Sequence, residues 1–195
     1  MKFNLKIHNC CALDDLRIVM KHILFDGDFI IASDAHILAV ININDLGASD
    51  EEKEVLKSLK GKLLHRTAFL KIWNKEVTPT EKGFDCPAEF FSVNFSTDET
   101  WKYPNWKAVI PNHDKIQKQS LVGLNPEPLL KLSMALPFNK RQVVLSIIDP
   151  CKAITVLAND PEIKSYGIIM PVMVDGVPEK LELNRETMLF NHFIS

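Results

Sequence analysis

Residues 25–40 read FDGDFIIASDAHILAV, a stretch that contains a turn signal and two apolar runs separated by a polar tetrad. Asp26-Gly27 is a hairpin turn signal, because glycine readily adopts the positive φ angle that a tight turn requires. Apolar, often β-branched residues lie on both sides of this turn. The polar tetrad 33–36 then interrupts the apolar run, which resumes over 37–40. The pattern predicts two antiparallel strands, a sharp bend and a third strand.

Length and composition describe an ordinary soluble protein. The chain has 195 residues, of which 46% are hydrophobic and 25% charged, so it has room for one large domain or two small ones. The net charge of -2 gives no global signal for nucleic acid, and a local basic patch is the proper test. No run approaches the ~20 apolar residues that span a bilayer, and residues 1–10 lack a signal-peptide pattern. We therefore expect a cytoplasmic protein with no membrane partner.

The cysteines argue against a structural metal site. They are Cys10, Cys11, Cys86 and Cys151, and no two of them form a CxxC pair. Zinc sites in small modules usually need such closely spaced pairs. We expect buried, reduced thiols, with no metal and no cofactor.

Periodicity predicts the remaining elements. Residues 2–7 alternate between apolar and polar, which is typical of a half-buried strand. Within 45–60, Ser49 and Glu52 have the spacing of a capping box at a helix start. Residues 77–82, which include Pro79, read as a turn. Further helices are expected over 67–74, capped by Thr67, and over 125–136, capped by Asn125. Two short strands are expected within 84–95. Single strands are expected over 62–65, 121–124, 142–148, 153–157 and 166–173.

Three stretches resemble bacterial sliding clamps, the β subunit of DNA polymerase III, and they occur in the order of that family. SDAHILAV at 33–40 resembles the clamp segment A-T-D-G-H-R-L-A. WKYPNWKAVIP at 101–111 resembles an aromatic and proline-containing segment that closes one clamp domain. YGIIMPVM at 166–173 resembles the last clamp strand, which ends in M-P-M.

The resemblance implies an α+β fold of clamp-type βαββ half-modules, with antiparallel sheets and helices on one side. It implies a middle-domain-like unit over 1–112, the second half of a last domain over 113–174, and a C-terminal extension over 175–195. Residues 9–15 are too short for the first helix of a clamp half-module. A clamp subunit has three domains, each built from two halves, whereas this chain has room for three halves, so a standard dimeric ring is not expected.

The same resemblance implies a peptide-binding groove. In clamps the groove that receives partner peptides lies between the middle and last domains, and its walls come from the three segments above. Methionine in such a wall adapts to different side chains. Ile37 and Ala108 stand where the family has arginine. The groove residues implied are Ser33, Ala35, His36, Ile37, Leu38, Pro104, Val109, Ile169, Met170, Pro171 and Met173.

Two functions follow as alternatives. The first is a non-enzymatic DNA replication or repair accessory that binds linear peptide motifs of replication or repair proteins and also contacts duplex DNA. The second is a clamp-derived peptide-binding or regulatory module that does not touch DNA. The helical lysines also fit an ordinary solvated face with Glu/Lys pairs. The candidate DNA-facing residues are Lys53, Lys57, Lys71, Lys75 and Lys131.

An enzyme is not expected. Asp34 and His36 could in principle form an acid/base pair, but a structural or peptide-lining role for His36 fits the pattern better. The sequence contains no Gly-rich phosphate loop, HExxH motif or GxSxG motif. We therefore predict no catalytic residues.

Three half-modules leave one sheet edge without a pseudo-symmetric partner, and open edges invite pairing. This predicts either self-association or an edge covered by the C-terminal tail. Within the tail, Leu189 and Phe190 loosely resemble the end of a clamp-binding peptide. They can be read as core residues or as a segment that occupies the groove beside His36.

Overall fold

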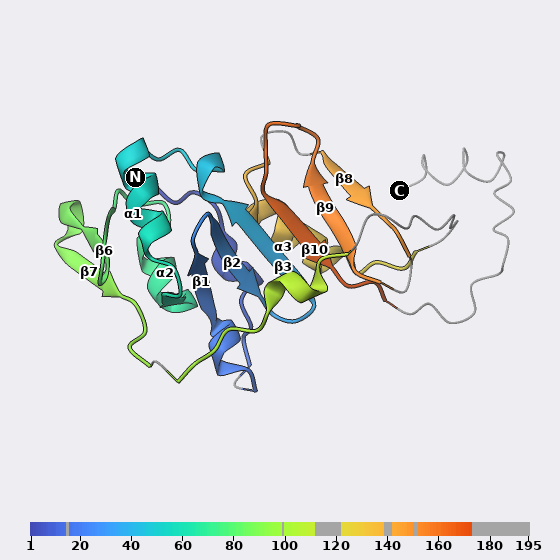
Figure 1. Ribbon diagram of the computed structural model, residues 1–195, viewed down its shortest axis with the longest axis horizontal. Helices are drawn as coiled ribbons and strands as arrows, with labels where there is room; N and C mark the ends of the chain where they lie inside the picture. Colours follow the sequence, from blue (N-terminus) through green and yellow to red (C-terminus); the bar gives the residue numbers. More distant parts are fainter. Residues whose placement is uncertain (15, 99, 112–121, 139–141, 150–151, 173–195) are drawn as a thin grey trace, which may run out of the picture.

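The computed structural model describes residues 1–14, 16–98, 100–111, 122–138, 142–149 and 152–172. Within these residues it has two antiparallel sheets and three α-helices, which confirms the predicted α+β class (Figure 1). The large sheet has seven strands in the order β4-β1-β2-β3-β10-β9-β8, and the small sheet has the order β5-β6-β7. The strands are β1 His22–Asp26, β2 Phe29–Ser33, β3 Ile37–Asn42, β4 Leu63–His65, β5 Thr78–Thr80, β6 Gly83–Cys86, β7 Phe91–Asn94, β8 Val143–Ser146, β9 Ile154–Ala158 and β10 Tyr166–Ile169. The helices are α1 Asp50–Ser58, α2 Arg66–Ile72 and α3 Pro126–Ala135.

The predicted hairpin and bend are both present. Asp26 pairs with Phe29, so that two residues turn the chain between β1 and β2, and Gly27 has φ +62°. In the bend, the Asp34 Oδ1 atom accepts the backbone N–H groups of His36 and Ile37, each at 2.9 Å. These local bonds replace the ladder bonds that the bend interrupts, and β3 then returns antiparallel to β2.

Strand β3 joins the two halves of the large sheet. It pairs antiparallel with β10, in a register that places Val40 opposite Tyr166 and Ile37 opposite Ile169. Strands β9 and β8 continue the sheet beyond β10 (Figure 1). The expected unit boundary at residue 112 stays a prediction, since one sheet runs through strands on both sides of it.

The three helices pack on one face of the large sheet, as the fold class requires. Phe25 of β1 is fully buried there, together with Leu56 of α1, Phe69 of α2 and Leu132 of α3. The opposite face carries residues such as Leu38 and is covered by an irregular segment, residues 101–110, that we call the strap. Figure 1 shows α3 behind β3 and β10, and the helical turn of the strap in front of them.

The predicted helix starts are mostly correct. Ser49 Oγ accepts the Glu52 N–H at 3.3 Å, and the Glu52 carboxylate accepts the Ser49 N–H at 2.9 Å, which completes the capping box. Asn125 caps α3, whose first residue is a proline. For α2 the cap is His65 rather than Thr67, because His65 Nδ1 accepts the Thr67 N–H at 3.3 Å.

Two strand predictions and one turn prediction were wrong. Residues 2–7 form no strand: Lys2 makes one isolated bridge to Glu76, and 7–10 form a 3₁₀ turn. The alternation there reflects Phe3 and Ile7 packing into the core from an irregular segment. Residues 78–80, expected as part of a turn, form β5, where Pro79 is tolerated because β5 is an edge strand. Of 121–124, the described residues contribute only the bridge from Gly123 to Val172.

A ring cluster fixes the beginning of the strap. His22 is buried, and its ring lies 4.8 Å from the ring of Trp101 and 4.9 Å from that of His65. Its Nδ1 atom lies 3.1 Å from the Ile18 carbonyl oxygen, which suits a neutral ring that donates there. Burial lowers the pKa of His22, and burial followed by the nearby Lys21 lowers the pKa of His65. Both imidazoles therefore favour the neutral form in the folded protein.

Among the described residues, no helix is long and apolar enough to cross a membrane.

We expect Ser49→Ala to lower the free energy of unfolding by about 1 kcal/mol, because the Glu52 N–H loses its acceptor. Urea unfolding followed by circular dichroism measures this change. Ser58→Ala is the matched control at the other end of α1, where the Ser58 hydroxyl donates to a carbonyl that water can also reach. Equal effects of the two substitutions would contradict the capping account.

We expect the folded state to lose stability as the pH falls below about 6.5, the ordinary histidine value. Because the folded pKa values of His22 and His65 are lowered, the unfolded chain binds more protons in this range, and unfolding takes up protons. Urea midpoints at several pH values between 8 and 5 test this, and His22→Gln should flatten the dependence. A midpoint that rises on acidification would be inconsistent with neutral, buried rings.

Candidate functional site

The three clamp-like segments meet at one apolar cavity of about 170 Å³ on the strap-covered face, which we call the groove pocket. The bend between β2 and β3 forms one wall, the strap a second, and the end of β10 a third. Eight of the eleven groove residues expected from the sequence line it: Ser33, Ala35, His36, Ile37, Leu38, Pro104, Val109 and Met170. The pocket is completed by Met20, Tyr103, Asn105, Trp106 and Ile168.

Three expected residues are placed differently. Ile169 is buried in the helix-side core, because neighbouring strand residues face opposite sides and Ile168 takes the pocket side. Pro171 lies two residues after the end of β10 and does not line the pocket. Met173 lies outside the described residues, as do Leu189, Phe190 and the rest of the C-terminal extension.

Of the lining residues that were not expected, most carried a usable signal. Tyr103, Asn105 and Trp106 belong to the same clamp-like segment as Pro104, so the segment pointed to them. Ile168 lies in the clamp-like strand segment as well, but the face on which it lies follows only from the register of β10 against β3. Met20 lies in a 3₁₀ turn before β1, and nothing in its sequence surroundings marks it as part of a site.

The β1–β2 hairpin anchors the strap. Trp106 is buried, and its indole Nε1–H donates to Asp26 Oδ2 at 3.0 Å. The indole also packs edge-on against Phe29, with ring centroids 5.7 Å apart. Asp26 and Phe29 flank the hairpin turn, so the turn fixes where the strap crosses the sheet. Trp106 can then form a rigid pocket wall, because its polar atom is satisfied.

The bend and β10 are tied together at the mouth of the pocket. The Met170 N–H donates to the His36 carbonyl oxygen at 3.0 Å, one step beyond the last ladder pair of β3 and β10. The side chains of Met170 and Val109 are 43% and 49% exposed, so both lie at the rim. The flexible Met170 side chain and the branched Val109 side chain thus border the opening of the pocket, where an incoming ligand would make its first contacts.

The pocket walls carry no carboxylate, ammonium or guanidinium group, because none of the thirteen lining residues is Asp, Glu, Lys or Arg. Burial raises the pKa of the Tyr103 phenol far above its ordinary value, so this side chain stays neutral. Burial also raises the pKa of the nearby Cys11 thiol to about 12. Cys10, Cys11 and Cys86 are free and buried, as expected, and Cys151 lies outside the described residues.

The size of the groove pocket suits one apolar side chain. An engineered apolar cavity of roughly 150 Å³ stays dry and binds benzene. A pocket of about 170 Å³ with similar walls can therefore hold a side chain of the size of leucine or phenylalanine. Filling it would remove apolar surface from water on both partners, which is worth roughly 25 cal/mol per Å².

Asp34 and His36 do not form an acid/base pair. Asp34 Oδ1 accepts the two backbone N–H groups of the bend, so the carboxylate stabilises the turn. The Ser33 hydroxyl donates to the Ile37 carbonyl at 2.7 Å and accepts the Ala35 N–H at 3.1 Å. The polar tetrad thus shapes the wall of the pocket. In the described part of the chain, no three His, Cys, Asp or Glu side chains gather as metal ligands.

Most candidate DNA-facing lysines are paired with carboxylates. Lys53 lies 3.3 Å from Asp50, Lys57 2.8 Å from Glu54 and Lys131 3.0 Å from Glu127. Lys75 forms an ion pair with Glu89, while Lys71 is exposed on α2. The three α-helices together contain five acidic and five basic residues, so their exposed side carries no excess of positive charge.

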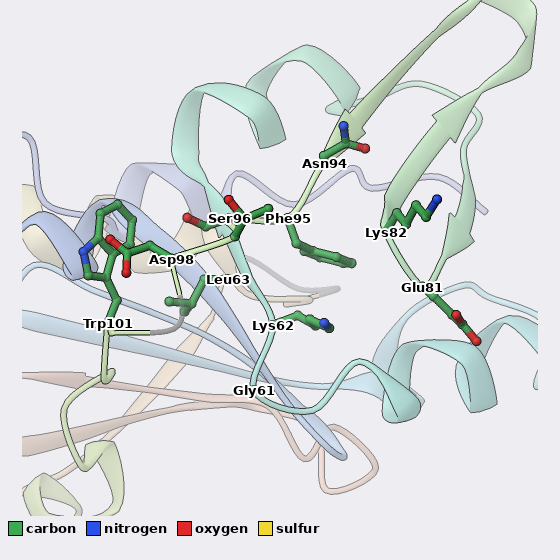
Figure 2. A pocket seen from close by; sticks show the side chains of 11 residues that line it. Gly61, Lys62, Leu63, Glu81, Lys82, Asn94, Phe95, Ser96, Asp98 and Trp101 are labelled. Atoms are coloured by element: carbon green, nitrogen blue, oxygen red, sulfur yellow. The ribbon is translucent and has the colours of Figure 1, made fainter.

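A larger cavity of about 480 Å³ lies between β4, the small sheet and the start of the strap (Figure 2). Lys62 and Lys82 line it together with Glu81 and Asp98, so the charges of its walls are balanced. Figure 2 shows Trp101 and Asp98 at one side of it, and Lys82 and Glu81 at the other. Its charged groups lie on opposite sides, whereas the walls of the groove pocket are mostly apolar.

Comparisons with known proteins agree with this geometry at the level of the fold. No family model matches the chain, and no curated protein does. Among solved structures, the beta clamp of Helicobacter pylori bound to a DNA ligase peptide is similar, with TM-score 0.60 and 12% identity over 87% of this chain and 62% of that chain. A sliding clamp from Bartonella birtlesii bound to griselimycin gives 0.57 and 13% over 87% and 63%. The clamp of Bacillus subtilis gives 0.57 and 12% over 88% and 60%.

The chain thus spans less than two thirds of the length of these clamps. At such low identity the likeness shows the fold and not the activity. The seven-stranded antiparallel sheet with its helices on one face, together with these structural matches, shows that the chain has the fold of a bacterial sliding clamp in a highly divergent form.

Proposed function

We propose that this protein is a non-enzymatic, clamp-like accessory that binds a short linear peptide of a replication or repair protein in the groove pocket. The observation that supports it is the convergence of the bend, the strap and β10 on one mostly apolar cavity. These segments come from both sides of residue 112. The pocket therefore lies between the middle-domain-like unit (1–112) and the last-domain-like unit (113–174) that we propose.

The pocket is suited to an apolar anchor with a polar backbone around it. One leucine- or phenylalanine-sized side chain fills the cavity, and Met20 and Met170 can adjust to its shape. Ser33, His36 and Asn105 are the lining residues other than Tyr103 and Trp106 that carry polar side-chain atoms, so they are the groups available to bind the peptide backbone or a polar neighbour. Because Ile37 occupies an arginine position of the clamp pattern, selection by charge is weak and apolar anchoring dominates.

The structural comparisons support a peptide as the ligand. The Helicobacter pylori clamp, which has a similar fold, is bound to a DNA ligase peptide. The Bartonella birtlesii clamp is bound to griselimycin. We extend peptide binding to this chain because its own residues build an apolar cavity from the three segments that resemble clamp motifs.

Binding of duplex DNA is the second candidate function, and the charges on the helices disfavour it. DNA affinity depends on lysine and arginine side chains that release counterions from phosphates. Lys53, Lys57, Lys75 and Lys131 each have a carboxylate partner, which a phosphate would have to displace. We therefore prefer the peptide-binding module without DNA contact.

A substitution at the rim tests the peptide site. We expect Met170→Glu to weaken binding of a synthetic DNA ligase peptide at least tenfold, because the carboxylate would have to be desolvated beside an apolar anchor. Isothermal titration calorimetry measures the dissociation constant. Leu130→Glu, at an exposed position of α3 on the other face, is the matched control and should leave the affinity unchanged. Equal affinities for the wild type and Met170→Glu would place the site elsewhere.

A salt titration tests the DNA alternative. We expect no binding of a fluorescent DNA duplex by micromolar protein at low salt, measured by anisotropy. If binding occurs and falls steeply with salt, phosphate contacts are present and the DNA-free proposal is wrong. Lys71→Glu would then show whether α2 makes these contacts.

A further inference from the structure

The turn between β6 and β7 presents one large apolar side chain to solvent. Residues 87–90 read PAEF, and the pairing of Cys86 with Phe91 closes this turn. Phe90 is 96% exposed, more than any other large apolar side chain among the described residues. It gains almost no burial in its own chain, so core packing does not account for a phenylalanine at this position.

The backbone of Phe90 makes the residue type more unusual still. Its φ and ψ angles are +57° and +38°, in the left-handed region that glycine and asparagine adopt most readily. A bulky side chain in this region lowers the stability of the folded state, and here no packing gain offsets that loss. Residues held in such conformations are common at binding sites, where the strained group serves recognition.

The segment that follows α2 holds this turn rigidly. Lys75 forms an ion pair with Glu89, and its Nζ atom lies 5.0 Å from the centroid of the Phe91 ring. On the other side of the turn, Cys86 Sγ donates to the Glu76 carbonyl oxygen at 3.5 Å. The exposed phenyl ring is therefore presented from a fixed backbone, and a preorganised group loses little conformational entropy on binding.

The groove pocket has the properties that such an aromatic anchor requires. Its volume of about 170 Å³ accommodates a phenyl ring, its walls are mostly apolar, and Met20 and Met170 can adapt to the ring. Within one chain the two features lie apart. The small sheet is at one end of the molecule, beyond α1 and α2, whereas the strap crosses in front of β3 and β10 (Figure 1). The turn thus cannot reach the pocket of its own folded chain.

We propose that Phe90 of one copy of this chain fills the groove pocket of a second copy. This inference rests on the proposed function, because it requires the groove pocket to be a binding site. The turn and the pocket are different surfaces, so the copies join head to tail through a heterologous interface. Phe90 and the partner peptide exclude each other from the same pocket, so a rising concentration of the chain should weaken peptide binding.

The mass of the full chain in solution tests this contact. In analytical ultracentrifugation the mass of the wild type should rise with concentration above the 22.2 kDa of one chain. Phe90→Gly removes the anchor and suits the positive φ angle, so it should weaken association at least tenfold without lowering the urea midpoint. Phe90→Leu keeps an apolar anchor and should keep the association. Leu130→Ser, which removes an exposed leucine of α3, is the matched control and should also associate.

Two defective variants should complement each other. Met170→Glu blocks the pocket but keeps Phe90, whereas Phe90→Gly keeps the pocket but lacks the anchor. Each variant alone should be monomeric, and an equimolar mixture should contain a one-to-one complex with twice the mass of one chain. A symmetric contact, in which both copies use the same surface patch, does not predict this recovery.

Binding of the DNA ligase peptide separates this inference from the proposed function. Phe90→Gly should bind the peptide at least as tightly as the wild type does, and added peptide should dissociate wild-type assemblies. A wild type that stays monomeric, association that survives in Phe90→Gly, or a mixture without complex would overturn the inference. In these cases tight peptide binding by Phe90→Gly leaves the proposed function standing. If the variants complement each other but no peptide binds, the inference stands and the proposed peptide ligand is wrong.

Discussion

The pairing of β3 with β10 is the contact on which the rest of the structure depends. It joins a hairpin near the start of the chain to strands near the end of the described part, and so makes one sheet of seven strands. Its register places Ile37 opposite Ile169 and brings the His36 carbonyl to the Met170 N–H. A slip by one residue would send Ile168 into the helix-side core and Ile169 into the pocket. The groove pocket therefore exists only in this register.

The strap converts this sheet face into a pocket. Without it, Leu38 and Ile168 would lie open on the sheet surface. The Trp106–Asp26 hydrogen bond fixes the strap to the hairpin, and the edge-on packing of Trp101 against His22 fixes its beginning. Both anchors are polar or aromatic groups whose geometry is specific, whereas the pocket itself is apolar. The two anchors thus hold the strap rigidly, while the methionine side chains at the cavity can adapt to a ligand.

Local signals explain what could be predicted from the sequence. The Asp26-Gly27 turn, the capping box of Ser49 and the Asn125 cap each rest on neighbouring residues, and all three were correct. The resemblance to clamp segments added the long-range step, since it brought the bend, the strap and β10 together before any register was known. It placed eight residues in the pocket but exchanged Ile169 for Ile168, because strand alternation requires the register.

Other features had local signals that tertiary context overrode, or no local signal at all. The alternation of residues 2–7 matches a strand, yet the backbone there is irregular, since tertiary packing and not pairing sets which side chains are buried. Pro79 argued for a turn, although an edge strand tolerates it. Met20 reaches the pocket from a 3₁₀ turn whose position follows from the fold. Lys53, Lys57 and Lys131 form ion pairs with carboxylates three or four residues away on the same helix. This is the helical spacing that fits an ordinary solvated face.

Mapping a bound peptide tests the central claim most directly. A DNA ligase peptide that carries a photoreactive phenylalanine analogue at its apolar anchor position can be crosslinked to the full chain and located by mass spectrometry. Binding in the groove pocket predicts crosslinks to the segments around Met20, His36 and Met170. Crosslinks confined to the helix face or to the cavity around Lys62 and Lys82, or the absence of any specific crosslink, would contradict the account.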